Sequence, residues 1–215
     1  GMSDKTLSVT DKQASQHRFL GSGIEGLLRI ASSYSHRFDE VVLSLPKGRK
    51  LQAITVSANR RQTTIINATL ENATLNTNGY LLRIEGSRIK NSKFTTPNII
   101  NIFKTELTDS QVKTEGGHIY AENIQVHGKV ELDSHNHLRL FLSKTEFDRI
   151  NLDMSSKHGG IYHNAQREHP RQRENELTNP YKTDKADVKD LLIIKANQDI
   201  YLTKEEEYSA PPRNH

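Results

Sequence analysis

Two aspartates recur at positions where paired carboxylates could do chemistry. Asp133 and Asp153 follow leucines in the segments "LDS" and "LDM". Carboxylates that share a face can act as an acid–base pair or hold calcium, as in carbohydrate-active enzymes. The equivalent positions in other segments carry other side chains: Ser57, Asn76, Thr95 and Lys113. Without a third carboxylate or a companion arginine we assign no catalytic residue, and we keep Asp133 and Asp153 as candidates for a binding face.

Three histidines also recur at a similar interval. His118, His137 and His158 follow the apolar anchors of their segments by five or six residues, with His135 nearby. Stacked neutral imidazoles could bind a transition metal, and protonated ones would repel each other below about pH 6.5. The third alternative is exposed turn histidines in a chain that contains 10 of them. We favour the turn residues and expect neither a metal nor a cofactor.

Charged residues recur in the same manner. Glu85, Lys104 and Glu122 fall near one repeat position. A second set falls near another: Lys90, Asp109, His127 and Asp148. If the repeats stack, alternating signs attract between neighbours and fix the register, each pair contributing about 0.2–1 kcal/mol. A groove for a charged ligand is the alternative, so Glu85, Lys104 and Glu122 join the binding-face candidates.

The elements that must position these residues are short segments repeated every 18–20 residues. Their central apolar residues are Val56, Leu75, Phe94, Val112, Leu132 and Leu152. A second apolar set comprises Ile66, Ile84, Ile102, Ala121 and Leu142, and a third comprises Leu70, Ile89, Leu107, Val126 and Phe147. Turn-forming residues follow the third set at Asn72, Asn91, Asp109 and Gly128, and Arg149 breaks this pattern.

Apolar and polar residues alternate within the segments, as in "LLRIEG" and "VELDS", which indicates β-strands. Three short strands per repeat predict an all-β fold, a single-domain parallel β-solenoid of about six coils. A lone coil would bury about three apolar side chains at roughly 1.5–3 kcal/mol each. Ordering its roughly twenty residues costs about 1–2 kcal/mol each. Coils are therefore stable only when stacked, and a thin core suits a chain that is 33% hydrophobic.

The repeats divide the chain into consecutive parts of one domain. Residues 2–49 should supply N-terminal strands and a cap, and residues 50–163 the solenoid. The polar, charged stretch 164–189 reads as a surface excursion. Residues 190–203 resemble a hairpin-like pair that caps the C-terminal end, and 204–215 a tail. Of the N-terminal strand candidates, "GIEGLLRIASSYS" (23–35) could also be a short helix.

Composition excludes several classes of function. The chain has no Cys, which rules out disulfides, thiol nucleophiles and Cys-bound zinc. Its net charge of +4 comes from 30 basic and 26 acidic residues that are interleaved, so a nucleic-acid groove is not indicated. No apolar run has the length of a transmembrane helix, and "GMSDKTLSV" is unlike a signal peptide. Gly1 before Met2 resembles an expression-tag scar. Location in the cell stays open.

The residues "LPKGRKLQAITVSANRRQTTIINATLEN", then "VKTEGGHIYAENIQVHGK", then "LLIIKANQDIYL" resemble the bacterial adhesin-like β-strand repeat family DUF4097. Members typically enter through an LPKG segment, here Leu45–Gly48, and repeat a GDI corner. Here "NGYLL", "GGHIY", "HGGIY" and "NQDIY" stand at the corner. The resemblance covers roughly residues 40–203. It implies a β-solenoid without enzymatic activity that is often tethered to a membrane or exposed on the cell surface.

Together these observations predict a non-catalytic β-solenoid that binds or scaffolds an unknown protein or polysaccharide, as an adhesin-like protein would. One alternative is a carbohydrate-binding or carbohydrate-active β-helix that uses the Asp133 and Asp153 face. Another is an intracellular or membrane-linked stress accessory module that assembles through its solenoid ends.

Overall fold

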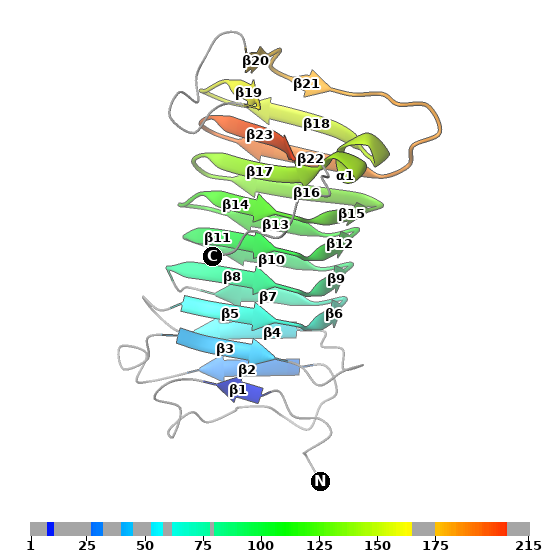
Figure 1. Cartoon of the computed structure of the whole chain (residues 1–215). Coiled ribbons are helices and arrows are strands. Elements are labelled where there is room, and N and C mark those ends of the chain that lie inside the picture. The colour runs from blue at the N-terminus through cyan, green and yellow to red at the C-terminus, as the bar shows by residue number, and fades with distance from the viewer. Residues whose placement is uncertain are drawn as a thin grey trace, which may run out of the picture.

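The computed structural model is a parallel β-solenoid in which strands stack above one another along one axis (Figure 1). It describes residues 8–10, 27–31, 40–44, 53–57, 62–77, 80–164 and 175–205. The fold class predicted from the repeats is confirmed. "LPKG" at 45–48 and the tail from residue 206 lie outside the described residues.

The described strands form three sheets that run along the stack. In spatial order, sheet A contains β1 (Ser8–Thr10), β3 (Glu40–Ser44), β5 (Gln62–Ile66), β8 (Leu81–Glu85), β11 (Ile99–Phe103), β14 (Ile119–Glu122), β17 (Leu138–Ser143), β23 (Ile200–Glu205), β19 (Ile161–His163) and β20 (Glu176–Leu177). Sheet B contains β2 (Leu27–Ala31), β4 (Ala53–Ser57), β7 (Thr74–Thr77), β10 (Lys93–Thr96), β13 (Gln111–Thr114), β16 (Lys129–Ser134), β22 (Leu191–Ala196), β18 (Asn151–Ser156) and β21 (Tyr181–Lys182).

Sheet C is shorter and contains β6 (Thr69–Glu71), β9 (Arg88–Lys90), β12 (Glu106–Thr108) and β15 (Gln125–His127). Each regular coil runs from sheet B through sheet A to sheet C before it rises to the next coil. The segment 23–35, which the sequence left open between strands and helix, contributes the strand β2.

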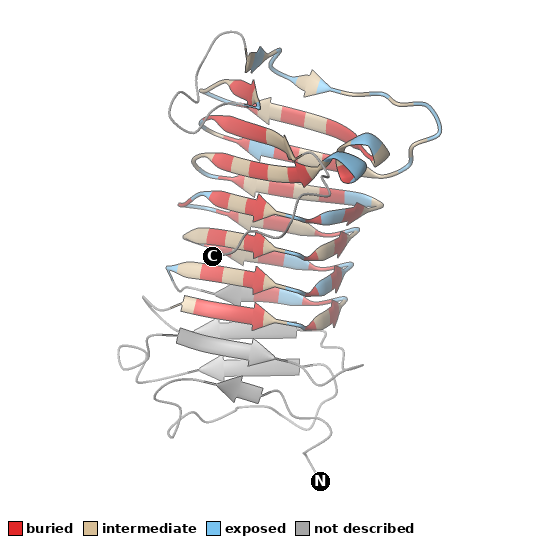
Figure 2. Ribbon diagram, viewed as in Figure 1, coloured by how far each residue is buried: buried red, intermediate tan, exposed pale blue. Residues whose placement is uncertain are grey.

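The core is a thin column of side chains that point inward from successive coils. Leu75, Phe94, Val112 and Leu132 are direct register partners in sheet B, as their shared repeat position predicted. The same holds in sheet C for the predicted set Leu70, Ile89, Leu107 and Val126. Figure 2 shows the buried and less buried positions alternating along the strands.

Several predicted register positions are wrong by one or two residues at the ends of the column. Ile54, not Val56, pairs with Leu75, and Leu152 aligns with Val130 rather than Leu132. In sheet A, Ile65 and Leu140 hold the positions assigned to Ile66 and Leu142. A third-set partner at Phe147 is absent because that residue lies in a helix.

Two corners of the coil use residues with positive φ. The corner from sheet C to sheet B contains the predicted Asn72, Asn91, Asp109 and Gly128, with φ of 55°, 49°, 46° and 66°. The corner from sheet A to sheet C contains Asn67, Gly86, Lys104 and Asn123, with φ of 51°, 61°, 48° and 54°. Asparagine, aspartate and glycine tolerate this conformation, whereas lysine adopts it rarely.

Buried hydroxyl groups join neighbouring coils at these corners. Ser92 Oγ accepts a hydrogen bond of 3.0 Å from the amide of Ala73 in the coil before it. The Ser92 amide in turn donates 3.0 Å to Ser110 Oγ in the coil after it. Ser87 and Thr105 repeat this arrangement at the other corner. The hydroxyls satisfy backbone donors that the turns would otherwise leave buried and unpaired.

Sheet C ends at β15, where the helix α1 (Lys144–Arg149) takes the place of another strand. The Ser143 side chain caps α1 by accepting from the Glu146 amide at 3.1 Å. The buried Glu146 carboxylate accepts a hydrogen bond of 2.7 Å from the Val126 amide, and Arg149 donates to the Val126 carbonyl. Glu146 and Arg149 therefore bond the Val126 amide and carbonyl, which another strand of sheet C would otherwise have paired.

The C-terminal strands occupy the interior of the stack, so the prediction that 190–203 caps the solenoid is wrong. β22 lies between β16 and β18, and β23 lies between β17 and β19 (Figure 1). They belong to different sheets and do not form a hairpin. β20 and β21, from the segment expected to be a surface excursion, pair antiparallel with β19 and β18 and cover this end.

Candidate functional site

The two candidate aspartates do not occupy equivalent positions on sheet B. Asp133 is the register partner of Lys195, and Asp153 is the partner of Ile193. The inserted strand β22 separates them, which sequence spacing could not reveal. Lys182 Nζ lies 4.0 Å from Asp153 Oδ2. The predicted pairing of Asp133 with Asp153 one coil apart is therefore wrong.

The outer face of sheet B carries a ladder of alternating charge instead. Lys113, Asp133 and Lys195 are successive register partners. Lys195 Nζ also lies 2.8 Å from Glu131 Oε1, and Gln111 donates 2.8 Å to the other oxygen of that carboxylate. An alternating ladder was predicted, but at Glu85, Lys104 and Glu122.

These contacts perturb the titration of the ladder. Partial burial raises the pKa of the Asp133 carboxyl above its usual range, and the positive charges of Lys113 and Lys195 oppose that rise. The hydrogen bond and the charge of Glu131 raise the pKa of the Lys195 ammonium. The charges on this face thus interact mainly with one another.

Glu85, Lys104 and Glu122 do not form one ladder. Glu85 and Glu122 share a register position, but the residue between them is Phe103. Lys104 lies one residue further on, in the corner with positive φ. Glu85 pairs within its own strand with Arg83 at 3.1 Å. The second predicted ladder is also wrong by one residue, since Thr108 and not Asp109 aligns with Lys90 and His127.

Two of the three candidate histidines are neighbours. The rings of His118 and His137 have centroids 6.2 Å apart and precede register partners in β14 and β17. His158 is not the next neighbour along the stack. The inserted coil, formed by β22 and β23, lies in between and places Asp199 next to His137. The Asp199 amide donates 3.2 Å to His137 Nδ1. Among the described residues, no group of three or more acidic or histidine side chains is arranged to hold a metal ion.

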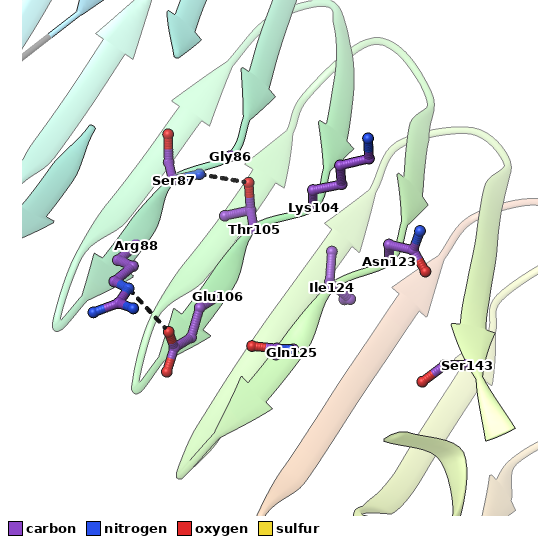
Figure 3. A pocket seen from close by; sticks show the side chains of 10 residues that line it. All are labelled: Gly86, Ser87, Arg88, Lys104, Thr105, Glu106, Asn123, Ile124, Gln125 and Ser143. Atoms are coloured by element: carbon purple, nitrogen blue, oxygen red, sulfur yellow. Dashed lines mark hydrogen bonds and ion pairs between the residues drawn. The ribbon is translucent and has the colours of Figure 1, made fainter. Parts of the chain in front are cut away.

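An open hollow of about 420 Å³ lies along the corner between sheets A and C (Figure 3). It crosses successive coils at Arg88, Glu106 and Gln125 and reaches Ser143, which caps α1. Arg88 Nε lies 3.4 Å from Glu106 Oε2, and His127 Nε2 lies 2.9 Å from Glu106 Oε1. A second hollow of about 480 Å³ follows the other side of sheet C, past Asn91, Asp109 and Lys129. Both are open corner grooves lined largely by polar side chains.

Sequence reasoning missed the aromatic residues on the outer face of sheet A. Phe103 and Tyr120 have ring centroids 5.7 Å apart, and Tyr120 and Phe141 5.4 Å. Further along the stack, the rings of Tyr201 and Tyr162 are 5.7 Å apart. The sequence did carry a signal for this cluster, because consecutive repeats have an aromatic residue at an outward position of the strand.

The family comparison agrees with this architecture. The family described as Toastrack DUF4097 matches residues 2–203. Searches of curated proteins and of solved structures gave no match. In the part of the chain that the structure describes, none of the helices has the length and apolar character to span a membrane.

Proposed function

Because the chain belongs to the Toastrack family, DUF4097, we propose that it is a non-catalytic scaffold that binds a partner through its outer faces. The observation that carries this proposal is how the charged side chains pair. Lys195 pairs with Glu131, and Glu106 with Arg88 and His127, all between neighbouring coils. Charges paired along a stack stiffen the surface and do not converge on one reacting centre. A surface of this kind suits many weak contacts with a protein or polymer.

Adhesion at the cell surface is the more specific form of this proposal. It requires that the outer faces be accessible outside the cell. Protease treatment of intact cells, followed by detection of the protein, tests that requirement. Digestion on intact cells is expected of an adhesin. Digestion only after lysis would overturn adhesion and favour the intracellular or membrane-linked accessory role, with scaffolding retained.

The carbohydrate-directed alternative is weakened by the position of β22. An acid–base pair or a calcium site would need Asp133 and Asp153 on a common column, and Lys195 and Ile193 are their partners instead. The alternative predicts that Asp153→Asn abolishes sugar binding or turnover. The scaffold proposal predicts no sugar turnover by the unmodified protein.

Site-specific photo-cross-linking in cells tests the scaffold itself. A photoreactive residue would replace Asn101 on sheet A, Thr108 on sheet C or Lys113 on sheet B, one variant for each outer face. The proposal expects one face to give a discrete adduct and the others to serve as its controls. A protein that gives no adduct from any face, or that turns over a substrate, would contradict it.

A further inference from the structure

The outer face of sheet A differs from the other faces because aromatic side chains cross its centre. We call Phe103, Tyr120 and Phe141 the aromatic stripe. Their rings are tilted by 49° and 43° to one another, and each side chain is partly exposed. Arginines lie over rings on both sides of the centre. The guanidinium carbon of Arg83 is 4.7 Å from the Phe103 centroid, and that of Arg139 is 4.5 Å from the Tyr201 centroid.

The core does not require these rings. The opposite sides of the same strands carry Ile102, Ala121 and Leu140, each with 0% exposure. Cross-strand packing on an exposed face stabilises a sheet only modestly. Aromatic and arginine side chains are the types enriched in the buried centres of protein interfaces, where they contribute most of the binding energy.

The same geometry argues against a sugar as the occupant. A sugar ring stacks on an open aromatic face, and here Arg83 and Arg139 already lie over Phe103 and Tyr201. Charge is balanced as well, since Arg83 pairs with Glu85. A strongly acidic or basic partner would therefore find no complementary field, whereas a surface of balanced, alternating charge suits a copy of itself.

We propose that the aromatic stripe is the contact surface of a homodimer. Two outward columns run along sheet A. Arg83, Tyr120 and Arg139 belong to one column, and Glu85, Glu122 and Phe141 belong to the other in the same coils.

A two-fold axis parallel to the stack makes the facing strands run in opposite directions, so each column faces the other column of its mate. Arg83 then lies opposite Glu85, Tyr120 opposite Glu122, and Arg139 opposite Phe141. Each of these contacts is complementary. An axis parallel to the strands and midway between β11 and β14 would instead oppose Arg83 with Arg139. Charge therefore favours the first arrangement over this one.

The outer face of sheet A around the stripe is short along the stack, which limits the strength of the dimer. The strands from β5 to β19 in sheet A span about 30 Å along the stack at about 4.8 Å per strand. A patch of this size falls at the low end of specific interfaces, so the dimer should dissociate on dilution. The inference rests on the proposed function only in treating an outer face as a binding surface.

Sedimentation velocity of the full chain over a concentration series tests the proposal. The unmodified protein is expected to shift from monomer to dimer. Tyr120→Ala should weaken the dimer by about tenfold or more. Lys113→Ala, on sheet B of the same coil, is the matched control and should leave it unchanged. Circular dichroism confirms that each variant is folded.

A charge swap tests the pairing. Arg83→Glu should weaken the dimer, and the double variant Arg83→Glu, Glu85→Arg should restore it, since both members of each contact are exchanged. The chain has no Cys, so single-cysteine variants report proximity. Asn101→Cys should be linked into a dimer by a short bis-maleimide, and Thr95→Cys on sheet B should not.

Three results would overturn the dimer. They are a monomer at every concentration, a dimer unaffected by Tyr120→Ala and Arg83→Glu, or a different ligand bound by the stripe of a monomeric protein. A monomer that still gave a cross-linked adduct in cells would end this inference and leave the scaffold proposal in place.

Discussion

The regular coils and the end of the solenoid that contains β16 to β23, its upper end in Figure 1, form the same kind of stack from different interactions. From β7 to β15, each strand pairs with the strand 18–20 residues away in the chain, as Phe94 does with Leu75 and Val112. At the upper end, β22 enters from 62 residues beyond its partner β16, where Asp190 Oδ1 accepts a bond from the Gly128 amide. Local repetition specifies the first region, and long-range contacts between individual side chains specify the second.

Two aspartates fix the ends of the inserted coil. Asp190, just before β22, accepts 2.7 Å from Gly128 and pairs with Arg149 of α1. Asp199, just before β23, is 3% exposed and accepts 2.9 Å from the Gly160 amide and 2.9 Å from the Tyr201 hydroxyl. The regular corners use one residue with positive φ and, in several coils, a buried hydroxyl. Insertion out of sequence order requires directional, charged contacts.

The largest effect is expected from the core of the inserted coil. Ile194 has 0% exposure and lies between Leu132 and Met154. Ile194→Ala should destabilise the protein by about 2–5 kcal/mol. Its neighbour Ile193 faces outward, so Ile193→Ala should cost less than about 1 kcal/mol. Urea unfolding measures both, and hydrogen exchange should lose protection in β18 and β22 before β10 and β13. Uniform loss along the solenoid would show that the two regions are not energetically distinct.

The next effect concerns the end of sheet C. Glu146 is 6% exposed and satisfies the Val126 amide, so Glu146→Ala leaves a buried donor unpaired and removes one of the two carboxylates that pair with Arg149. We expect a loss of about 2–4 kcal/mol in urea unfolding. Glu106→Ala, in the middle of the same sheet, removes a partly exposed ion pair and should cost less than about 1 kcal/mol. Equal losses of stability in the two variants would mean that α1 contributes no more to the end of sheet C than an ordinary ion pair does.

The contributions of Asp190 and Asp133 to the stability of the fold should change in opposite directions with pH. Burial disfavours the charge of Asp190, but the hydrogen bond from Gly128 and the Arg149 guanidinium outweigh it and lower its pKa. A lowered pKa stabilises the fold fully above the unfolded value of about 3.9, and this stabilisation is lost as pH falls through the folded value. Asp190→Asn should therefore reduce stability at pH 7, and the deficit should shrink in acid.

Burial raises the pKa of Asp133, so its ionisation begins to destabilise the fold as the pH rises through the unfolded value of about 3.9, and the cost is complete above the raised folded value. Asp133→Asn should leave stability at pH 7 unchanged or slightly higher. Urea midpoints of both variants between pH 3 and pH 7 provide the comparison. Parallel pH profiles for the two variants would contradict the assignment of opposite shifts.

A small effect is expected at a regular corner. Lys104 has φ of 48°, which costs an L-residue with a Cβ about 1–2 kcal/mol. Lys104→Gly should stabilise the protein by about 0.5–1 kcal/mol after the entropic cost of glycine. Gly86→Ala, one coil earlier, is the converse, because the new Cβ would lie 2.5 Å from Asn67 Oδ1. Thermal unfolding should move in opposite directions for the two changes.

The regular region could be predicted because its information is local. The column from Leu75 to Leu132 and the turns at Asn72, Asn91 and Asp109 follow from a period in the sequence. The register of Leu152 failed because α1 and the inserted coil interrupt that period. α1 had a local signal, since Ser143 and Glu146 form a capping motif.

The candidate site was harder to predict than the fold. Surface positions follow the strand register residue by residue, and a shift of one residue moved Lys104 and Asp109 out of their predicted ladders. No spacing in the sequence could place Lys195 beside Asp133, because their contact depends on a strand that returns from the far end of the described chain. The aromatic stripe was visible as Phe103 and Tyr120, but only the register shows that they are neighbours.

The position of β22 and β23 sets an order of events during synthesis. Translation delivers β18 and β19 to the outside of the ribosome before the coil that separates them from β16 and β17 exists. Those two strands must therefore wait apart from the finished part of the protein, or be displaced from it, until residues 191–205 have left the exit tunnel. A solenoid built strictly from one end could grow while it is translated. In this chain the stack from β16 and β17 to β18 and β19 can be completed only after β22 and β23 have been made.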